Sequence, residues 1–181
     1  MSGHDLRPYW HLCQSCSCGV YAGHQPTKAY ADRVARMLFG TGAQESRYRH
    51  SRQIGYNIGT QGGAFSYWQV ELGSVCDSLN LIGRNQSVSD SVEAWLPLTL
   101  WRFLQTIPKN DHSELLRALV FSPELGVLMC RLHYLRVPTA IPATLEDQAV
   151  YWKRHYNTAL GAGTPARYLH NWVALCAEVA K

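Results

Sequence analysis

Helical periodicity runs through the second half of the chain, and it restricts the possible folds more than any other feature. Apolar residues recur there every three or four positions, the spacing that places them on one face of a helix. Two segments begin with a cap residue followed by proline, Ser122-Pro123 and Thr164-Pro165, as helices often do. The pattern predicts helices over residues 70–81, 91–107, 113–119, 123–136, 145–160 and 165–179.

The first half contains one helical segment and one irregular segment. Val34, Met37, Leu38 and Thr41 share a helical face, so we predict a helix over 27–39. Residues 52–63 carry glycines and asparagine around single apolar residues, a pattern of turns and short strands. We therefore expect a mainly α domain with a small Gly-rich β-hairpin or loop insert.

The first 25 residues differ from the rest because cysteines and histidines crowd together there. Cys13, Cys16 and Cys18 lie close in sequence, with His11 and His24 nearby. A chain of 181 residues has the length of one large domain. We interpret residues 1–25 as an N-terminal extension and residues 26–181 as the principal domain.

Charge and hydropathy exclude several classes of protein. With 46% hydrophobic and 17% charged residues, the composition is not that of a disordered chain. The net charge of +4 is spread thinly, without the dense basic run that marks a nucleic-acid tail, although an anionic polymer such as a cell wall would suit it. No apolar run reaches 18 residues, so we expect no membrane insertion. The N-terminal residues lack the features of a secretory signal, so synthesis in a reducing cytoplasm with free thiols is expected.

Glu45 is the first candidate for chemistry. It follows Leu38 by seven positions and Val34 by eleven, and on one continuous helix these spacings return to the same face. A carboxyl group at the inner end of a core helix loses hydration, which raises its pKa and suits it to general acid catalysis near neutral pH. The alternative is a surface residue paired with Arg47 or Arg49.

Glu45 opens the first of three short motifs that follow one another along the chain. The second motif comes directly after the Gly-rich segment, and the third lies in the predicted helix before Gly161. The motifs are Glu45-Ser46-Arg47-Tyr48, Gly63-Ala64-Phe65-Ser66-Tyr67-Trp68-Gln69 and His155-Tyr156-Asn157-Thr158.

In this order, the motifs resemble the lysozyme-like superfamily, in the branch that holds lytic transglycosylases and goose-type lysozymes. The resemblance extends over about 29–172, although the part between the second and third motifs rests mainly on helix pattern. Gly63, Ala64 and Gln69 match the family's second motif. Ser66 stands where glycine is usual, and Tyr67-Trp68 replace a small apolar pair.

The resemblance implies cleavage of the glycosidic bond between N-acetylmuramic acid and N-acetylglucosamine in peptidoglycan. It implies Glu45 as the catalytic acid and base, with no cofactor or metal. In the transglycosylase reaction one carboxylic acid suffices, whereas goose-type enzymes often add auxiliary aspartates, for which this chain offers Glu71 and Asp77. The residues expected to hold substrate or support Glu45 are Ser46, Gln69, Tyr67, Tyr156 and Asn157.

The motif, the size and the lack of a signal also resemble phage-encoded wall-degrading proteins. That resemblance implies synthesis in the host cytoplasm and action in the periplasm or cell wall, or carriage in a virion. The expected partner is peptidoglycan, and not nucleic acid. A membrane-perforating protein or virion proteins would bring the chain to its substrate.

Three other interpretations stay open at this point. A lysozyme-like fold can serve as a glycan-binding or virion-structural module without catalysis, and a side chain at Ser66 that narrowed the cleft would favour that. The N-terminal cysteines with His11 or His24 offer soft ligands for zinc, although a second cysteine pair is missing. Cys130 and His133 share a helical face as in a cysteine peptidase, but their apolar neighbours favour a structural thiol.

Overall fold

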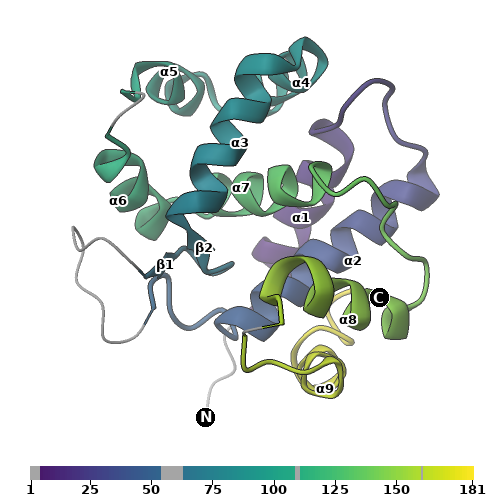
Figure 1. Ribbon diagram of the computed structural model, residues 1–181. Coiled ribbons are helices and arrows are strands. Elements are labelled where there is room, and N and C mark those ends of the chain that lie inside the picture. Colours follow the sequence, from purple (N-terminus) through teal and green to yellow (C-terminus); the bar gives the residue numbers. More distant parts are fainter. Residues whose placement is uncertain (1–4, 54–62, 109–110, 160) are drawn as a thin grey trace.

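The computed structural model describes residues 5–53, 63–108, 111–159 and 161–181. In these residues the protein is mainly helical, with a small two-stranded sheet (Figure 1). None of the helices in the described ranges is long and apolar enough to span a membrane. The elements in chain order are α1 (Arg7–Gly19), α2 (Lys28–Glu45), β1 (Ala64–Phe65), β2 (Val70–Glu71), α3 (Leu72–Arg84), α4 (Gln86–Trp95), α5 (Leu98–Thr106), α6 (Ser113–Phe121), α7 (Pro123–Leu135), α8 (Leu145–Trp152), the π-helical turn η1 (Lys153–Asn157) and α9 (Pro165–Leu175).

Helix α7 crosses the middle of the molecule, and the other elements surround it (Figure 1). It contacts α1, α2, α3, α6 and β2, and residues 125–132 are all buried. A helix that is buried around its whole circumference occupies such a central position, and its one charged residue in this run, Arg131, donates to the Val20 carbonyl. Its start is confirmed at Pro123, because the Ser122 hydroxyl accepts a hydrogen bond from the backbone N–H of Leu125.

Some predicted helices begin, end or divide at residues other than those expected. The segment 91–107 is divided between α4 and α5 at Pro97, whose missing N–H and fixed backbone angle interrupt a helix. The segment 145–160 changes from α8 to η1 at Lys153. Helix α2 continues beyond the predicted end at residue 39 and stops at Glu45.

Helix α1 packs as part of the main core. Helix α1 contacts α2 and α7, and Cys13 and Cys16 are fully buried, whereas Cys18 is exposed. The expected boundary at residue 25 therefore does not separate α1 from the rest. The two cysteines are three positions apart on one helical face, where a free thiol packs as a small hydrophobic group. In the described residues, no group of three or more His, Cys, Asp or Glu side chains is placed to hold a metal ion.

The Gly-rich insert ends in a small β-hairpin. Strands β1 and β2 are antiparallel, with Phe65 paired to Val70, and residues 66–69 form the turn between them. Most of the insert, 54–62, lies outside the described residues. The indole N–H of Trp68 donates to the carbonyl of Leu38 at 2.8 Å, which anchors the turn on α2. The hairpin is thereby held beside the C-terminal end of α2, where Glu45 lies.

Candidate active site

Glu45 is the last residue of α2, and its side chain points inward as the spacing predicted. Val34 and Leu38 on the same helix are fully buried, and the Glu45 carboxyl group is partly buried above them. The indole N–H of Trp152, at the end of α8, donates to Glu45 Oε1 at 2.9 Å. Gly163 makes room for this indole, because a Cβ there would lie 2.3 Å from the Trp152 ring.

The electrostatic environment keeps a proton on Glu45 near neutral pH. Burial raises the pKa of Glu45 from 4.5 to about 7, and the negative charge of Glu71 also raises it. The hydrogen bond from Trp152 acts in the opposite direction, because it stabilises the carboxylate. A carboxyl group with a pKa near 7 can donate a proton and take one back at physiological pH.

Glu45 lies between two adjoining cavities. The larger, which we call the main cavity, measures about 540 Å³ and extends toward α3, α7 and η1. The smaller, the side cavity, measures about 390 Å³ and extends past His50 and Arg52. Both are lined by Glu45, Gln69 and Glu71, so a ligand longer than one cavity can pass along Glu45.

The second and third motifs meet Glu45 at the main cavity. Gln69, Tyr156 and Asn157 all line it. The Gln69 amide donates to the Ser66 carbonyl at 2.8 Å, which fixes the side chain against the hairpin turn. The Tyr156 hydroxyl donates to the Trp68 carbonyl at 2.7 Å rather than to Glu45, and so connects the third motif to the second. The Asn157 side-chain oxygen accepts from Lys153 at 2.9 Å.

Two other expected site residues lie outside the main cavity. The Ser46 hydroxyl donates to the Gly42 carbonyl and accepts from the Tyr48 N–H, so it terminates α2, and the residue lines the side cavity. The Tyr67 ring packs edge-on against Tyr9 with centroids 5.1 Å apart, and the residue lines neither of the two cavities. Its neighbour Trp68 is fully buried in the core.

Ser66 does not narrow either cavity. Ser66 is buried, and its side chain packs against Gly126 of α7. A Cβ added at Gly126 would lie only 2.7 Å from the Ser66 Cβ, so the absence of a side chain at Gly126 makes room for Ser66. Its hydroxyl accepts from the Trp68 N–H at 3.2 Å. Serine at the usual glycine position is therefore accommodated by a glycine on the facing helix.

Unusual backbone conformation is concentrated at the three motifs. In the described part of the chain, five non-glycine residues have positive φ angles, and each belongs to one of the motifs. Such conformations cost about 1–3 kcal/mol each and cluster at functional sites. The residues are Arg47, Tyr48, Ser66, Gln69 and Thr158.

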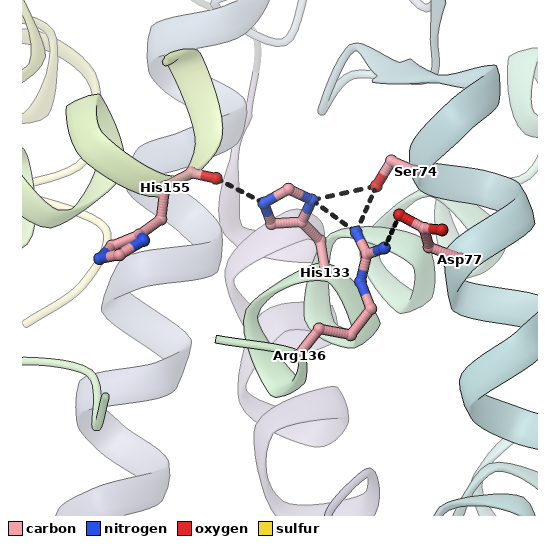
Figure 2. Close-up of polar contacts among 5 residues, drawn as sticks. All are labelled: Ser74, Asp77, His133, Arg136 and His155. Carbon is pink, nitrogen blue, oxygen red and sulfur yellow. Dashed lines mark hydrogen bonds and ion pairs between the residues drawn. The ribbon is translucent and has the colours of Figure 1, made fainter. Parts of the chain in front are cut away.

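The part of the main cavity formed by α3 and α7 carries a polar network that the sequence did not reveal. It joins Ser74 and Asp77 of α3 to His133 of α7 and to Arg136, the residue that ends α7 (Figure 2). The spacing of three residues, which places His133 and Arg136 on one helical face, was the available sequence signal for this network. Their partner Ser74 lies on α3, about 60 residues away in the sequence.

The cysteine-nucleophile interpretation finds no support in this arrangement. Cys130 is fully buried, and burial raises the pKa of its thiol well above the ordinary value. A thiol held in its neutral form is a poor nucleophile. The His133 ring nitrogens contact Ser74, Arg136 and the His155 carbonyl instead.

No match to this chain was found among protein-family models, curated proteins or solved structures.

Proposed function

We propose that this protein is a lysozyme-like, peptidoglycan-cleaving enzyme of the lytic-transglycosylase type, with Glu45 as its acid and base. The observation that carries the proposal is the position of Glu45: a partly buried carboxyl group with a raised pKa, held by Trp152 between two adjoining cavities. The strained backbone at the same three motifs supports it independently.

In the proposed reaction, protonated Glu45 donates its proton to the glycosidic oxygen as the bond to the muramyl anomeric carbon breaks. An oxocarbenium-like muramyl centre results, and the leaving sugar departs with a free hydroxyl. The Glu45 carboxylate then accepts the proton of the muramyl 6-hydroxyl, whose oxygen bonds to the anomeric carbon and closes a 1,6-anhydro ring. Glu45 is protonated again, and no water is consumed.

Trp152 helps Glu45 through both halves of this cycle. The hydrogen bond from its indole N–H stabilises the Glu45 carboxylate that forms when the proton leaves, while burial of Glu45 favours the return of the proton. Gln69 and Asn157 present amide groups at the main cavity, which suit the N-acetyl groups and hydroxyls of the glycan. The Gln69 amide donates to the Ser66 and His50 carbonyls, and the Asn157 oxygen accepts from Lys153, so both amides are oriented before substrate binds.

Glu71 is the group that would turn the reaction toward hydrolysis. It lines both cavities, and its charge acts on Glu45. Asp77, the other acidic candidate, is occupied by an ion pair with Arg136. If a water lay between Glu71 and the anomeric carbon, the product would be a reducing sugar. Analysis of the product ends distinguishes the two outcomes.

The experiment is release of soluble glycan from insoluble peptidoglycan by the wild-type protein and by Glu45→Gln. The wild type should release soluble fragments, and Glu45→Gln should release none above background. Glu93→Gln removes an exposed carboxylate of α4 and should cleave at the wild-type rate. Equal rates for wild type and Glu45→Gln would exclude Glu45 as the acid.

The place of action belongs to the same proposal. The substrate lies in the periplasm or cell wall, and in this proposal a membrane-perforating partner or a virion brings the protein to it. A non-catalytic glycan-binding module is the second candidate, but Ser66, the residue that favoured it, is buried against α7. Binding to purified peptidoglycan without fragment release would select this alternative.

A further inference from the structure

The polar network of α3 and α7 at the main cavity places one positive charge among carboxyl groups. Arg136 Nη2 lies 3.0 Å from His133 Nδ1 and donates to Ser74 Oγ at 3.2 Å. Another guanidinium nitrogen, Nη1, forms the ion pair with Asp77 (Figure 2).

His133 is neutral in this network, and the hydrogen-bond directions show why. A backbone carbonyl only accepts, so the 2.7 Å contact with the His155 oxygen places the ring proton on Nε2. The Nδ1 atom is then left as an acceptor for Arg136 and for the Ser74 hydroxyl. A second proton on Nδ1 would face the guanidinium, so His133 orients Arg136 without adding charge.

Arg136 is therefore the single cationic side chain among the described residues that line the main cavity. The same lining contains the carboxyl groups of Glu45, Glu71 and Asp77. An anionic group of a ligand would be repelled by the carboxylates of Glu71 and Asp77 and attracted by Arg136. Of the groups in this lining, the Arg136 guanidinium is thus the one whose charge favours a ligand carboxylate.

We propose that Arg136 binds a carboxylate carried by a muramyl residue of the substrate. The inference rests on the proposed function. Peptidoglycan carries such carboxylates in two places: on the stem peptide, or on the lactyl group where the peptide has been removed. Both present the planar pair of oxygens that a guanidinium binds with two hydrogen bonds.

Arg136 is available for this role because its present partner is easily exchanged. The Asp77 side chain is 63% exposed, and ion pairs with exposed groups add little stability. The Arg136 side chain is only 23% exposed, and its buried Nε–H has no hydrogen-bond partner within the described residues. A ligand carboxylate that displaced Asp77 would pair with a guanidinium that is already largely desolvated and held in position.

The test measures dissociation constants calorimetrically in the Glu45→Gln protein, so that no ligand is cleaved. Three tetrasaccharides are compared: a peptidoglycan fragment with stem peptides, the same fragment after amidase treatment, which leaves lactyl carboxylates, and chitotetraose, which has no carboxylate. Arg136→Gln, Arg136→Lys and Asp77→Asn are each added to the Glu45→Gln protein. Arg102→Gln, which removes an exposed charge from α5, is the matched control.

The expected result is a loss of about tenfold in affinity for at least one carboxylate-bearing ligand in Arg136→Gln, with chitotetraose binding changed less than about twofold. The ligand that loses affinity identifies the source of the carboxylate. Arg136→Lys should recover part of the loss because it keeps the charge without the paired donors. Asp77→Asn should bind that ligand about two- to threefold more tightly, because the competing carboxylate is gone.

A merely structural Arg136 would change all three affinities alike, and that result overturns the inference while the proposed function stands. Unchanged binding of both carboxylate-bearing ligands in Arg136→Gln overturns it as well. If the Glu45→Gln protein binds none of the three ligands, the glycan site itself is wrong, and the inference falls with the proposed function.

Discussion

Replacing Glu45 with glutamine should stabilise the protein at alkaline pH and leave it unchanged at acid pH. Burial raises the pKa of Glu45 from 4.5 to about 7, so the folded state holds this proton more tightly than the unfolded state. Below about pH 4.5 the group is protonated in both states, and glutamine is its near-isostere. Above pH 7 the folded protein must hold a buried carboxylate, so stability falls as pH rises between these values.

The difference in pKa sets the size of the effect. At about 1.4 kcal/mol per pKa unit, the rise from 4.5 to about 7 corresponds to an upper limit of about 3.5 kcal/mol. For a domain of this size, that is at most a change of about 7–14 °C in the midpoint of thermal unfolding. The glutamine side-chain oxygen can still accept the hydrogen bond from Trp152, so this contact is retained.

The assay is urea unfolding of wild type and Glu45→Gln at about pH 4.5 and about pH 8.5, where the linkage effect is smallest and largest. The free energies of unfolding should agree at the lower pH, and Glu45→Gln should be more stable at the higher pH. Glu93→Gln, at an exposed position of α4, should show no such divergence. A Glu45→Gln protein that equals or falls below wild type at the higher pH would refute the buried, proton-retaining carboxyl group.

Two further substitutions test the support around Glu45. Trp152→Phe removes a hydrogen bond that stabilises the carboxylate, so the pKa of Glu45 should rise, and the alkaline decline in the pH–rate profile should move up by about one pH unit; an unmoved profile would contradict this role. Gly126→Ala places a Cβ 2.7 Å from the Cβ of Ser66, the first residue of the hairpin turn. This overpacking should lower the free energy of unfolding, measured in urea, by about 1–3 kcal/mol. Gly83→Ala, where a Cβ meets open space on α3, should instead add up to about 1 kcal/mol, and equal effects at the two glycines would refute the packing argument.

The part of the site that depends on local sequence could be predicted. The inward direction of Glu45 followed from its spacing to Val34 and Leu38, because helical periodicity is a property of one element. The starts of α7 and α9 followed from a cap residue and a proline for the same reason. The resemblance to the lysozyme-like superfamily added Gln69, Tyr156 and Asn157 to the candidate site, and the structure brings all three to one cavity with Glu45.

The remaining features depend on contacts between distant segments. The network around Arg136 needs α3 against α7, and nothing in either segment shows that they are neighbours. Tyr67 was expected to hold substrate, but it lies in the hairpin turn and packs on Tyr9 of α1, a contact that its local sequence does not indicate. Cys13 and Cys16 have the spacing of metal ligands, but the same spacing makes a buried helical face, and only the packing of α1 decides between them.

The most direct test of the central claim is mass spectrometry of the fragments that the protein releases from purified peptidoglycan, compared with Glu45→Gln. We predict that wild type releases fragments lighter by one water than hydrolysed ones, because the muramyl end closes on its own 6-hydroxyl, and that Glu45→Gln releases none. Release of the same fragments by Glu45→Gln, or no release by the wild-type protein, would contradict the account.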